Sequence, residues 1–222
     1  MNPAEVFRRI QEIGIIPALR TADVSGAVRA AAAICGGGIP ILEISLAPPG
    51  ALAVLEAVAK AQGSEMLIGA GTVLDADTVR RASQTGAQFI VTTGFSSAVV
   101  ETAARSSLAI FAGAMTPTEV QTASLARPEA VKLFPCYAIG GPRYIKTLRG
   151  QYPHVDLIAS GGVTLENCAE YLQAGACAVG VGGEIADAES IATGNHRVFA
   201  ERARRFRKAI TEAQPRGSVQ QG

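Results

Sequence analysis

The sequence predicts an α/β protein built as a closed (β/α)8 barrel of the TIM type, preceded by one N-terminal helix. Two observations favour this fold class. Short apolar runs alternate with longer helical patterns along the whole chain, which is the rhythm of repeated strand–helix units around a parallel sheet. The chain has 222 residues, and eight such units in that length favour a closed barrel over a doubly wound sheet.

The eight predicted strands are short runs rich in Ile, Val, Leu and Ala, separated by polar or glycine-containing segments. A helix over 3–12 precedes them, and a final helix covers about 195–213. We therefore expect one barrel domain over 1–213 and a flexible polar tail over 214–222. The predicted strands are 15–20, 39–46, 66–70, 88–93, 108–113, 130–135, 155–160 and 177–182.

Four polar residues are expected to begin helices between these strands. Asp23, Asp75, Thr116 and Thr164 each precede a helical pattern, and their side-chain oxygens can accept hydrogen bonds from the free N–H groups of a first turn. Pro117 follows Thr116 and suits the first helical position, where no N–H donor is needed.

Composition excludes several classes of partner. The formal net charge is +1, which gives no general attraction for nucleic acid or an anionic membrane. We interpret Arg202, Arg204, Arg205 and Arg207 as a solvated helix face. The four cysteines lie in separate segments, so neither a disulfide framework nor a zinc knuckle is expected. No leader-like start and no apolar run of membrane-spanning length is present, and we expect a soluble, cytoplasmic protein.

Side-chain alternation along the strands places charged groups inside the barrel. Alternate residues of a barrel strand point inward, and active sites lie at the C-terminal ends of the strands. Glu43 in the second strand and Lys132 in the sixth fall on the inward faces, and Arg20 falls at the inward end of the first. Thr72 and Thr93 are expected at the rims of the third and fourth strands.

Lys132 is the strongest candidate for a nucleophile. It lies in "EAVKLFP" among apolar neighbours, and an ammonium without water around it either finds a partner or gives up its proton. A neutral amine can attack a carbonyl to form a Schiff base, with Glu43 moving protons. Arg20 can bind a carboxylate such as that of a 2-oxo acid. The alternative is a Lys132–Glu43 ion pair that only fixes the core.

Two glycine pairs predict a phosphate site. Gly161 and Gly162 follow the seventh strand, and Gly182 and Gly183 follow the eighth, where barrels commonly bind phosphate through backbone N–H groups. A short helix starting near Ala186 would add its N-terminus. The substrate is then expected to be a phosphorylated acid.

No metal or cofactor is expected. The chain has only two histidines, His154 and His196, and neither lies near the inward acidic groups, so the usual imidazole ligands of a zinc site are missing. The glycine motifs that bind dinucleotides or nucleoside triphosphates do not occur after the predicted strands.

An ordered set of motifs resembles the 2-keto-3-deoxy-6-phosphogluconate (KDPG) and 4-hydroxy-2-oxoglutarate (KHG) aldolase family, including its 6-phosphogalactonate (KDPGal) branch. The motifs are "ILEISL", "IGAGTVL", "QFIVTTGF", "VKLFP", "GPRYIKTL", "SGGVTLEN" and "GVGG", over about residues 10–210. The resemblance implies a class I lyase on a trimeric barrel that cleaves the phosphorylated keto-deoxy acid to pyruvate and glyceraldehyde 3-phosphate. It also implies that Lys132 forms the Schiff base, Glu43 is the general acid/base, and Thr72 binds the pyruvoyl carboxylate.

One departure from the family pattern concerns the carboxylate. The gluconate branch has an arginine just after the second strand, where this chain has Ala47. Arg20 resembles the arginine that galactonate-branch members carry at the end of strand one. The accepted stereochemistry at C4 and the use of unphosphorylated substrates therefore stay open, with KDPGal-specific and KHG aldolases as alternatives. A phosphosugar epimerase or isomerase without imine chemistry, and a non-catalytic sugar-phosphate binding module, are the rivals from other classes.

Overall fold

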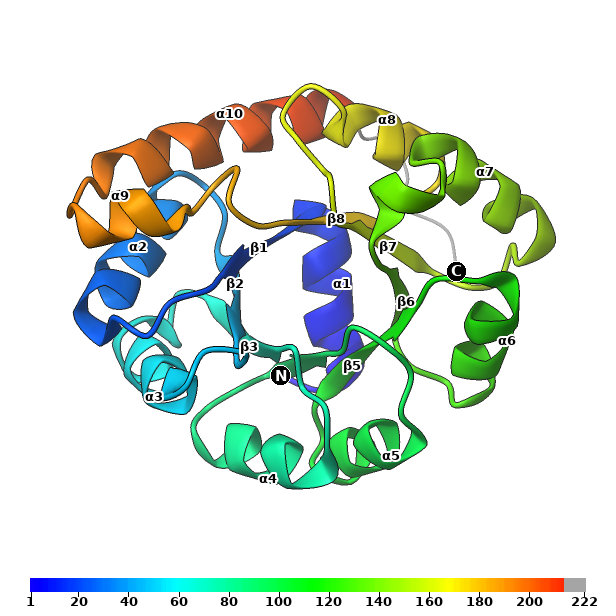
Figure 1. Ribbon diagram of the computed structural model, residues 1–222, viewed down its shortest axis with the longest axis horizontal. Coiled ribbons are helices and arrows are strands. Elements are labelled where there is room, and N and C mark those ends of the chain that lie inside the picture. Colours follow the sequence, from blue (N-terminus) through cyan, green and yellow to red (C-terminus); the bar gives the residue numbers. More distant parts are fainter. Residues whose placement is uncertain (214–222) are drawn as a thin grey trace.

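Eight parallel strands close into a barrel in the computed structural model, which describes residues 1–213 (Figure 1). The strands follow one another around the ring in chain order, and β8 returns to pair with β1. The helices lie outside the ring, and α1 lies across one end of it (Figure 1). The expected (β/α)8 barrel with an N-terminal helix is confirmed.

Each predicted strand is present. Six are shortened by one to three residues, where the chain turns into a loop, and the other two, β3 and β5, keep their predicted length but lie one residue later. The strands are β1 (Ile15–Leu19), β2 (Ile41–Ser45), β3 (Leu67–Gly71), β4 (Phe89–Val91), β5 (Ala109–Ala114), β6 (Ala130–Leu133), β7 (Leu157–Ser160) and β8 (Ala178–Val181). The helices are α1 (Pro3–Ile13), α2 (Val24–Gly36), α3 (Ala51–Gln62), α4 (Ala76–Gln84), α5 (Ser97–Arg105), α6 (Pro117–Leu125), the 3-10 turn η1 (Cys136–Ile139), α7 (Pro142–Gln151), α8 (Cys168–Gln173), α9 (Ala188–Ala192) and α10 (Arg197–Ala213).

Three of the four expected helix starts are confirmed. The side chains of Asp23, Asp75 and Thr116 cap α2, α4 and α6. The expectation for Thr164 is wrong, because α8 begins four residues later, after Asn167. The backbone N–H of Thr164 donates to Oδ1 of Asn167 at 2.8 Å, so the amide side chain three residues on closes a separate turn before the helix.

Aromatic rings fill the barrel interior near its amino-terminal end. Phe89 and Phe111 point inward with ring centroids 5.7 Å apart, and Phe7 of α1 packs on Phe111 at 6.1 Å. Gly69 makes room for the first of these rings, since a β-carbon there would lie 2.2 Å from Phe89. α1 therefore closes the amino-terminal end of the barrel, and chemistry is left to the carboxyl end.

The expected solvated arginine face of α10 is wrong for two of its four members. Arg204 and Arg205 are exposed, but Arg202 and Arg207 are half-buried. Nη1 of Arg207 donates to the carbonyl of Ile13 at 3.0 Å, and Arg202 pairs with Asp187. The helical period alone could not show that the end of α1 and the loop before α9 contact this side of α10.

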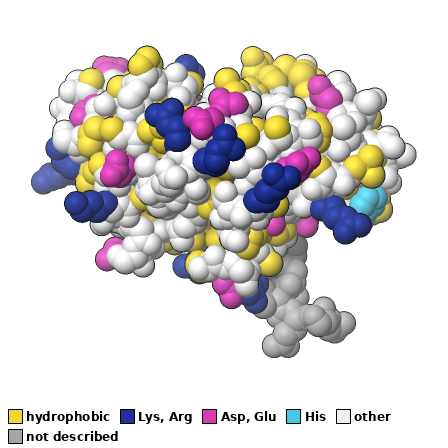
Figure 2. All heavy atoms as spheres, turned by 90° about the horizontal axis from the view of Figure 1, so that it is seen from below, with side chains coloured by type: hydrophobic (Ala, Val, Ile, Leu, Met, Phe, Trp, Pro, Cys, Tyr) yellow, Lys and Arg dark blue, Asp and Glu magenta, His cyan; other side chains and the backbone are white. Residues whose placement is uncertain are grey.

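Basic and acidic side chains are interspersed on the face shown in Figure 2, which agrees with the near-zero net charge. Among residues 1–213, no helix combines the length and apolar character needed to cross a membrane. The polar tail expected over 214–222 lies outside the described residues.

Candidate active site

Lys132 and Glu43 meet inside the carboxyl end of the barrel. They come from β6 and β2, which are four strands apart in the ring, and Nζ of Lys132 lies 3.9 Å from Oε2 of Glu43. Their side chains are 8% and 7% exposed, so both charged groups lie largely away from water. The alternation of inward and outward residues that predicted this meeting is therefore confirmed for these two residues.

Gly71 provides the space for the glutamate. A β-carbon at Gly71 would lie 1.9 Å from Oε1 of Glu43, so only glycine leaves room for the carboxylate above the end of β3. Ser45 is level with Gly71 in the β2–β3 register. Sequence reasoning missed Gly71. The sequence feature that could have indicated it is a glycine at an inward position of "IGAGTVL", where any other residue would project a side chain into the barrel.

The lysine has no competing nucleophile beside it. The Phe134 ring lies under the ammonium group, with its centroid 5.4 Å from Nζ of Lys132, and such a face attracts a cation. Cys136 follows in the next loop, and burial raises the pKa of its thiol to about 11. Its Sγ donates to the carbonyl of Leu133 at 3.0 Å, so the cysteine stays protonated and engaged.

Thr72 lies at the rim as expected, in a strained backbone conformation. Its φ is 59°, a left-handed value that a β-branched residue adopts only at a cost of about 1–3 kcal/mol. Its hydroxyl shares a hydrogen bond of 3.0 Å with the hydroxyl of Ser45. Such strain is typical of functional sites. The hydrogen bond to Ser45 holds the Thr72 hydroxyl at the end of β3.

Arg20 lies at the mouth and not beside the glutamate. The register pairs Ala18 with Glu43, so Arg20 stands two residues, or about 7 Å, further along the strand direction. Its side chain is exposed, and among residues 1–213 it forms no ion pair. The three-residue cluster expected inside the barrel is therefore a buried pair with an arginine above it.

Thr93 lies just beyond the end of β4, at the rim as expected, and is half-buried. Its neighbour Thr92 is buried, and the hydroxyl of Thr92 accepts the N–H of Gly113 at 2.8 Å. Thr93 brings its backbone close to Gly113, where a β-carbon would lie 2.3 Å from the Thr93 carbonyl carbon. This strand end is therefore tied to β5 through the Thr92 hydroxyl and through a close backbone contact.

The two glycine pairs lie at neighbouring strand ends. β7 pairs with β8, and Ser160 is level with Gly180 just before the two loops. Gly161 and Gly162 have φ values of 86° and 74°, which favour glycine. Around Gly182 and Gly183 the space is open, since a β-carbon at either would meet nothing within 4 Å. In the described part of the chain, none of these four glycines donates its N–H to another backbone group.

The short helix expected near Ala186 does not offer a free N-terminus. α9 begins at Ala188, and the carboxylate of Asp187 caps it by accepting the N–H of Ser190 at 2.8 Å. The Asp187 carboxylate therefore already occupies the start of this helix, where a phosphate would have to bind.

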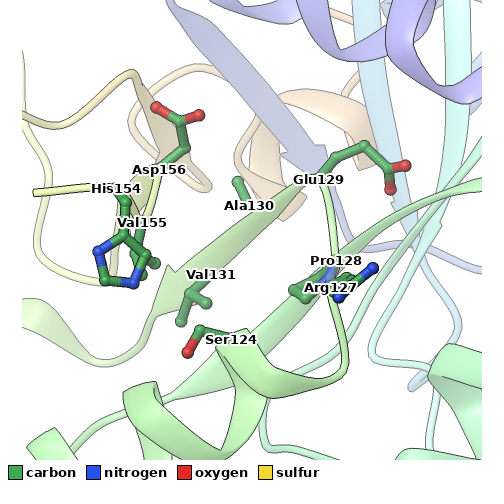
Figure 3. A pocket seen from close by; sticks show the side chains of 9 residues that line it. All are labelled: Ser124, Arg127, Pro128, Glu129, Ala130, Val131, His154, Val155 and Asp156. Carbon is green, nitrogen blue, oxygen red and sulfur yellow. The ribbon is translucent and has the colours of Figure 1, made fainter. Parts of the chain in front are cut away.

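A cavity lies on the side of the barrel opposite to Lys132 and Glu43, at the amino-terminal ends of strands. It has a volume of about 290 Å³ and opens beside the amino-terminal ends of β6 and β7 (Figure 3). Arg127, His154 and Asp156 are among its lining residues, and burial raises the pKa of the Asp156 carboxyl.

No cluster of metal-ligating side chains occurs within 1–213.

Comparison with known proteins places this barrel among aldolases. Residues 6–200 match the family model described as KDPG and KHG aldolase. The chain is 34% identical over 204 residues to a 2-dehydro-3-deoxy-6-phosphogalactonate aldolase of Escherichia coli strain K12, covering 91% of this chain and 97% of that protein.

Solved structures agree with the sequence match. A KDPG aldolase from Legionella pneumophila, with pyruvate captured at low pH as a covalent carbinolamine intermediate, has a TM-score of 0.84 and 28% identity, covering 92% of this chain and 97% of that one. A cube-shaped cage designed by fusing symmetric oligomeric domains has a TM-score of 0.84 and 33% identity, covering 91% and 73%. The chain belongs to the KDPG and KHG aldolase family, whose members are carbon–carbon lyases.

Proposed function

We propose that the protein is a class I aldolase that cleaves a 2-keto-3-deoxy-6-phospho sugar acid, KDPG, to pyruvate and D-glyceraldehyde 3-phosphate. One observation carries the proposal: a lysine and a carboxylate lie 3.9 Å apart inside the mouth of the barrel. The similar Legionella enzyme, with its covalent pyruvate carbinolamine, supports imine chemistry on this scaffold.

The lysine supplies the electron sink. Neutral Lys132 attacks the C2 carbonyl to give a carbinolamine, and uptake of a proton with loss of water gives an iminium ion. Glu43 takes the proton of the C4 hydroxyl, directly or through a water, as the C3–C4 bond breaks and its electrons move into the iminium. The aldehyde leaves, Glu43 returns the proton to C3 of the enamine, and water hydrolyses the imine to release pyruvate.

Arg20 and Thr72 are the proposed ligands of the substrate carboxylate. Thr72 presents a hydroxyl at the end of β3, and Arg20 is an exposed cation at the end of β1 with no ion-pair partner among the described residues. A guanidinium fits a carboxylate through two parallel hydrogen bonds.

Gly161, Gly162, Gly182 and Gly183 are the proposed phosphate ligands. Their N–H groups have no backbone acceptor within the described chain, and unpaired N–H groups at adjacent strand ends form a ready site for an anion. The site lies over β7 and β8, next to the strand that carries Lys132. A substrate held there by its phosphate can therefore present its carbonyl to the amine.

Reductive trapping tests the chemistry. The protein is incubated with pyruvate and sodium borohydride, digested, and mapped by mass spectrometry. We expect a single reduced adduct on Lys132, and no adduct in Lys132→Met. Lys146→Met, which removes an exposed lysine of α7, is the matched control and should still be trapped. No adduct, or an adduct on another lysine, would refute the assignment of Lys132. Catalytic activity that survives in Lys132→Met would favour the epimerase class.

The galactonate epimer is the second candidate substrate. Ala47 stands where the gluconate branch has its arginine, Arg20 resembles the arginine of the galactonate branch, and the Escherichia coli relative is named for the phosphogalactonate substrate. Assays of the two C4 epimers side by side, with pyruvate release coupled to lactate dehydrogenase, give the ratio of kcat/KM. A ratio above 10 in either direction assigns the branch.

We also propose that the enzyme is a homo-oligomer, specifically a trimer. The similar designed cage was assembled from symmetric oligomeric domains, and Leu74, Leu125 and Tyr137 leave large apolar side chains exposed on the isolated chain. Sedimentation equilibrium at micromolar concentration should give three times the mass of one chain. A monomer would contradict the proposal.

A further inference from the structure

The two glycine-bearing loops rest on the same stretch of α10. The loop after β7 and the loop after β8 border a pocket of about 110 Å³ against this helix. The helix is therefore the common support of both proposed phosphate loops. The lining residues are Leu165, Glu166, Glu184, Arg202, Arg205 and Phe206.

Arg202 joins α10 to the loop after β8. Its Nη1 donates to the carbonyl of Ile185 at 3.4 Å and to Oδ2 of Asp187. The side chains of Arg202 and Asp187 are 31% and 30% exposed, so the ion pair is partly screened from water. A guanidinium with two partners in one loop limits how that loop can move relative to the helix.

The same loop is then tied back to the glycines. The N–H groups of Ile185 and Ala186 donate to the carbonyl of Gly182 at 3.0 and 3.2 Å. Asp187 is itself fixed by Ser190, which donates through its N–H at 2.8 Å and its hydroxyl at 2.9 Å. A continuous set of contacts therefore runs from Arg202 to the carbonyl of Gly182.

Glycines need such support if they are to bind an anion well. Gly182 and Gly183 have nothing within 4 Å of a β-carbon position, so no neighbouring side chain limits their backbone. A glycine backbone loses more conformational entropy than any other on ordering, and a loop ordered in advance spares the ligand that cost.

We propose that Arg202 is a positioning residue for the phosphate site: it fixes the loop after β8 so that the N–H groups of Gly182 and Gly183 are arranged before the substrate binds. This inference rests on the proposed function. Arg202 acts through Ile185 and Asp187 and touches no substrate. Its loss should weaken recognition of the phosphate end and leave the pyruvate end unchanged.

The test compares two substrates that differ only in phosphate. For the wild type and Arg202→Met, kcat and KM are measured with 2-keto-3-deoxy-6-phosphogluconate and with 2-keto-3-deoxygluconate. We expect KM for the phosphorylated acid to rise by roughly 10- to 100-fold in the variant, the scale expected for a misplaced binding group. The unphosphorylated acid and the trapping of pyruvate by borohydride should change less than about twofold, and Arg202→Lys should recover part of the affinity because it keeps the charge.

Arg205→Met is the matched control, since Arg205 lines the same pocket from the same helix but is exposed; it should leave both KM values unchanged. An equal loss on both substrates in Arg202→Met, or no loss on either, would overturn the positioning role. A wild-type protein that releases no pyruvate from either substrate would refute the proposed function instead, so the two failures are distinguishable.

Discussion

At the scale of single residues, the buried pair is held by few contacts. Beyond their mutual approach at 3.9 Å, neither Lys132 nor Glu43 takes part in a side-chain hydrogen bond that the structure records for residues 1–213. Burying charges with unfilled hydrogen-bonding positions costs free energy that a purely structural pair would recover through further partners. The unfilled positions favour a catalytic role, in which the substrate supplies them.

Replacing Gly71 by alanine should damage catalysis more than folding. The added methyl group would overlap Oε1 of Glu43 and push the carboxylate away from the lysine. We expect kcat to fall by about 100-fold or more, within the range for a lost general acid/base, while far-UV circular dichroism stays unchanged. Gly94→Ala, at the next strand end with open space around its β-carbon position, is the control. A Gly71→Ala enzyme with normal kcat would show that Glu43 does not need this position.

At the scale of elements, short helices and loops at the barrel mouth are fixed by charged caps. The Asp187 carboxylate caps α9 and pairs with Arg202, and these hydrogen bonds lower its pKa from 3.8 to about 2. A carboxyl group whose pKa is lower in the folded protein stabilises the fold above the unfolded pKa, and this contribution is lost as the pH falls through the folded pKa. The cap therefore stabilises the mouth from neutral pH down to about pH 4 and weakens towards pH 2.

Asp187→Asn should expose this dependence. Asparagine keeps the cap but loses the charge, so the free energy of unfolding should fall by about 1 kcal/mol at pH 7, the upper end for a partly solvated pair. The difference from the wild type should shrink between pH 4 and pH 2 in urea titrations. Asp75→Asn, which alters a cap without an arginine hydrogen bond, should cost less. A difference that stayed constant down to pH 2 would mean that the ion pair contributes nothing.

At the scale of the whole molecule, the first and last helices close the structure around the barrel. α1 covers the amino end, and α10 reaches it through Arg207, whose guanidinium donates to the carbonyl of Ile13. This contact joins residues 194 positions apart in the chain. Because it forms only when the ring of strands is closed, it couples the stability of the two chain ends.

Arg207→Met should therefore lower global stability without touching catalysis. The loss of a charge-assisted hydrogen bond from a half-buried position predicts a decrease of about 1.5–3 kcal/mol in the free energy of unfolding. Urea unfolding at matched protein concentration measures it, since association also contributes to apparent stability. Arg204→Met, exposed on the same helix, should change stability by less than about 0.5 kcal/mol. An unchanged midpoint for Arg207→Met would contradict this coupling.

The sequence alone determined the order of the strands, the barrel, and the inward positions of Lys132 and Glu43. These follow from alternation with a period of two residues and from the rhythm of strand and helix, which are local properties of the chain. Local capping chemistry likewise located Asp23 and Asp75. It failed at Thr164, because Oδ1 of Asn167 accepts the N–H of Thr164 and closes a separate turn before α8.

Only the tertiary structure decided how high each group stands in the barrel and what supports it. The stagger of β1 against β2 lifted Arg20 to the mouth, and the closeness of β2 and β3 made Gly71 necessary for Glu43. The folding of a loop onto α10 turned Arg202 from a solvated residue into a support for that loop. Each of these depends on a contact between residues far apart in the chain, and no local pattern reports such a contact because closure of the barrel creates it.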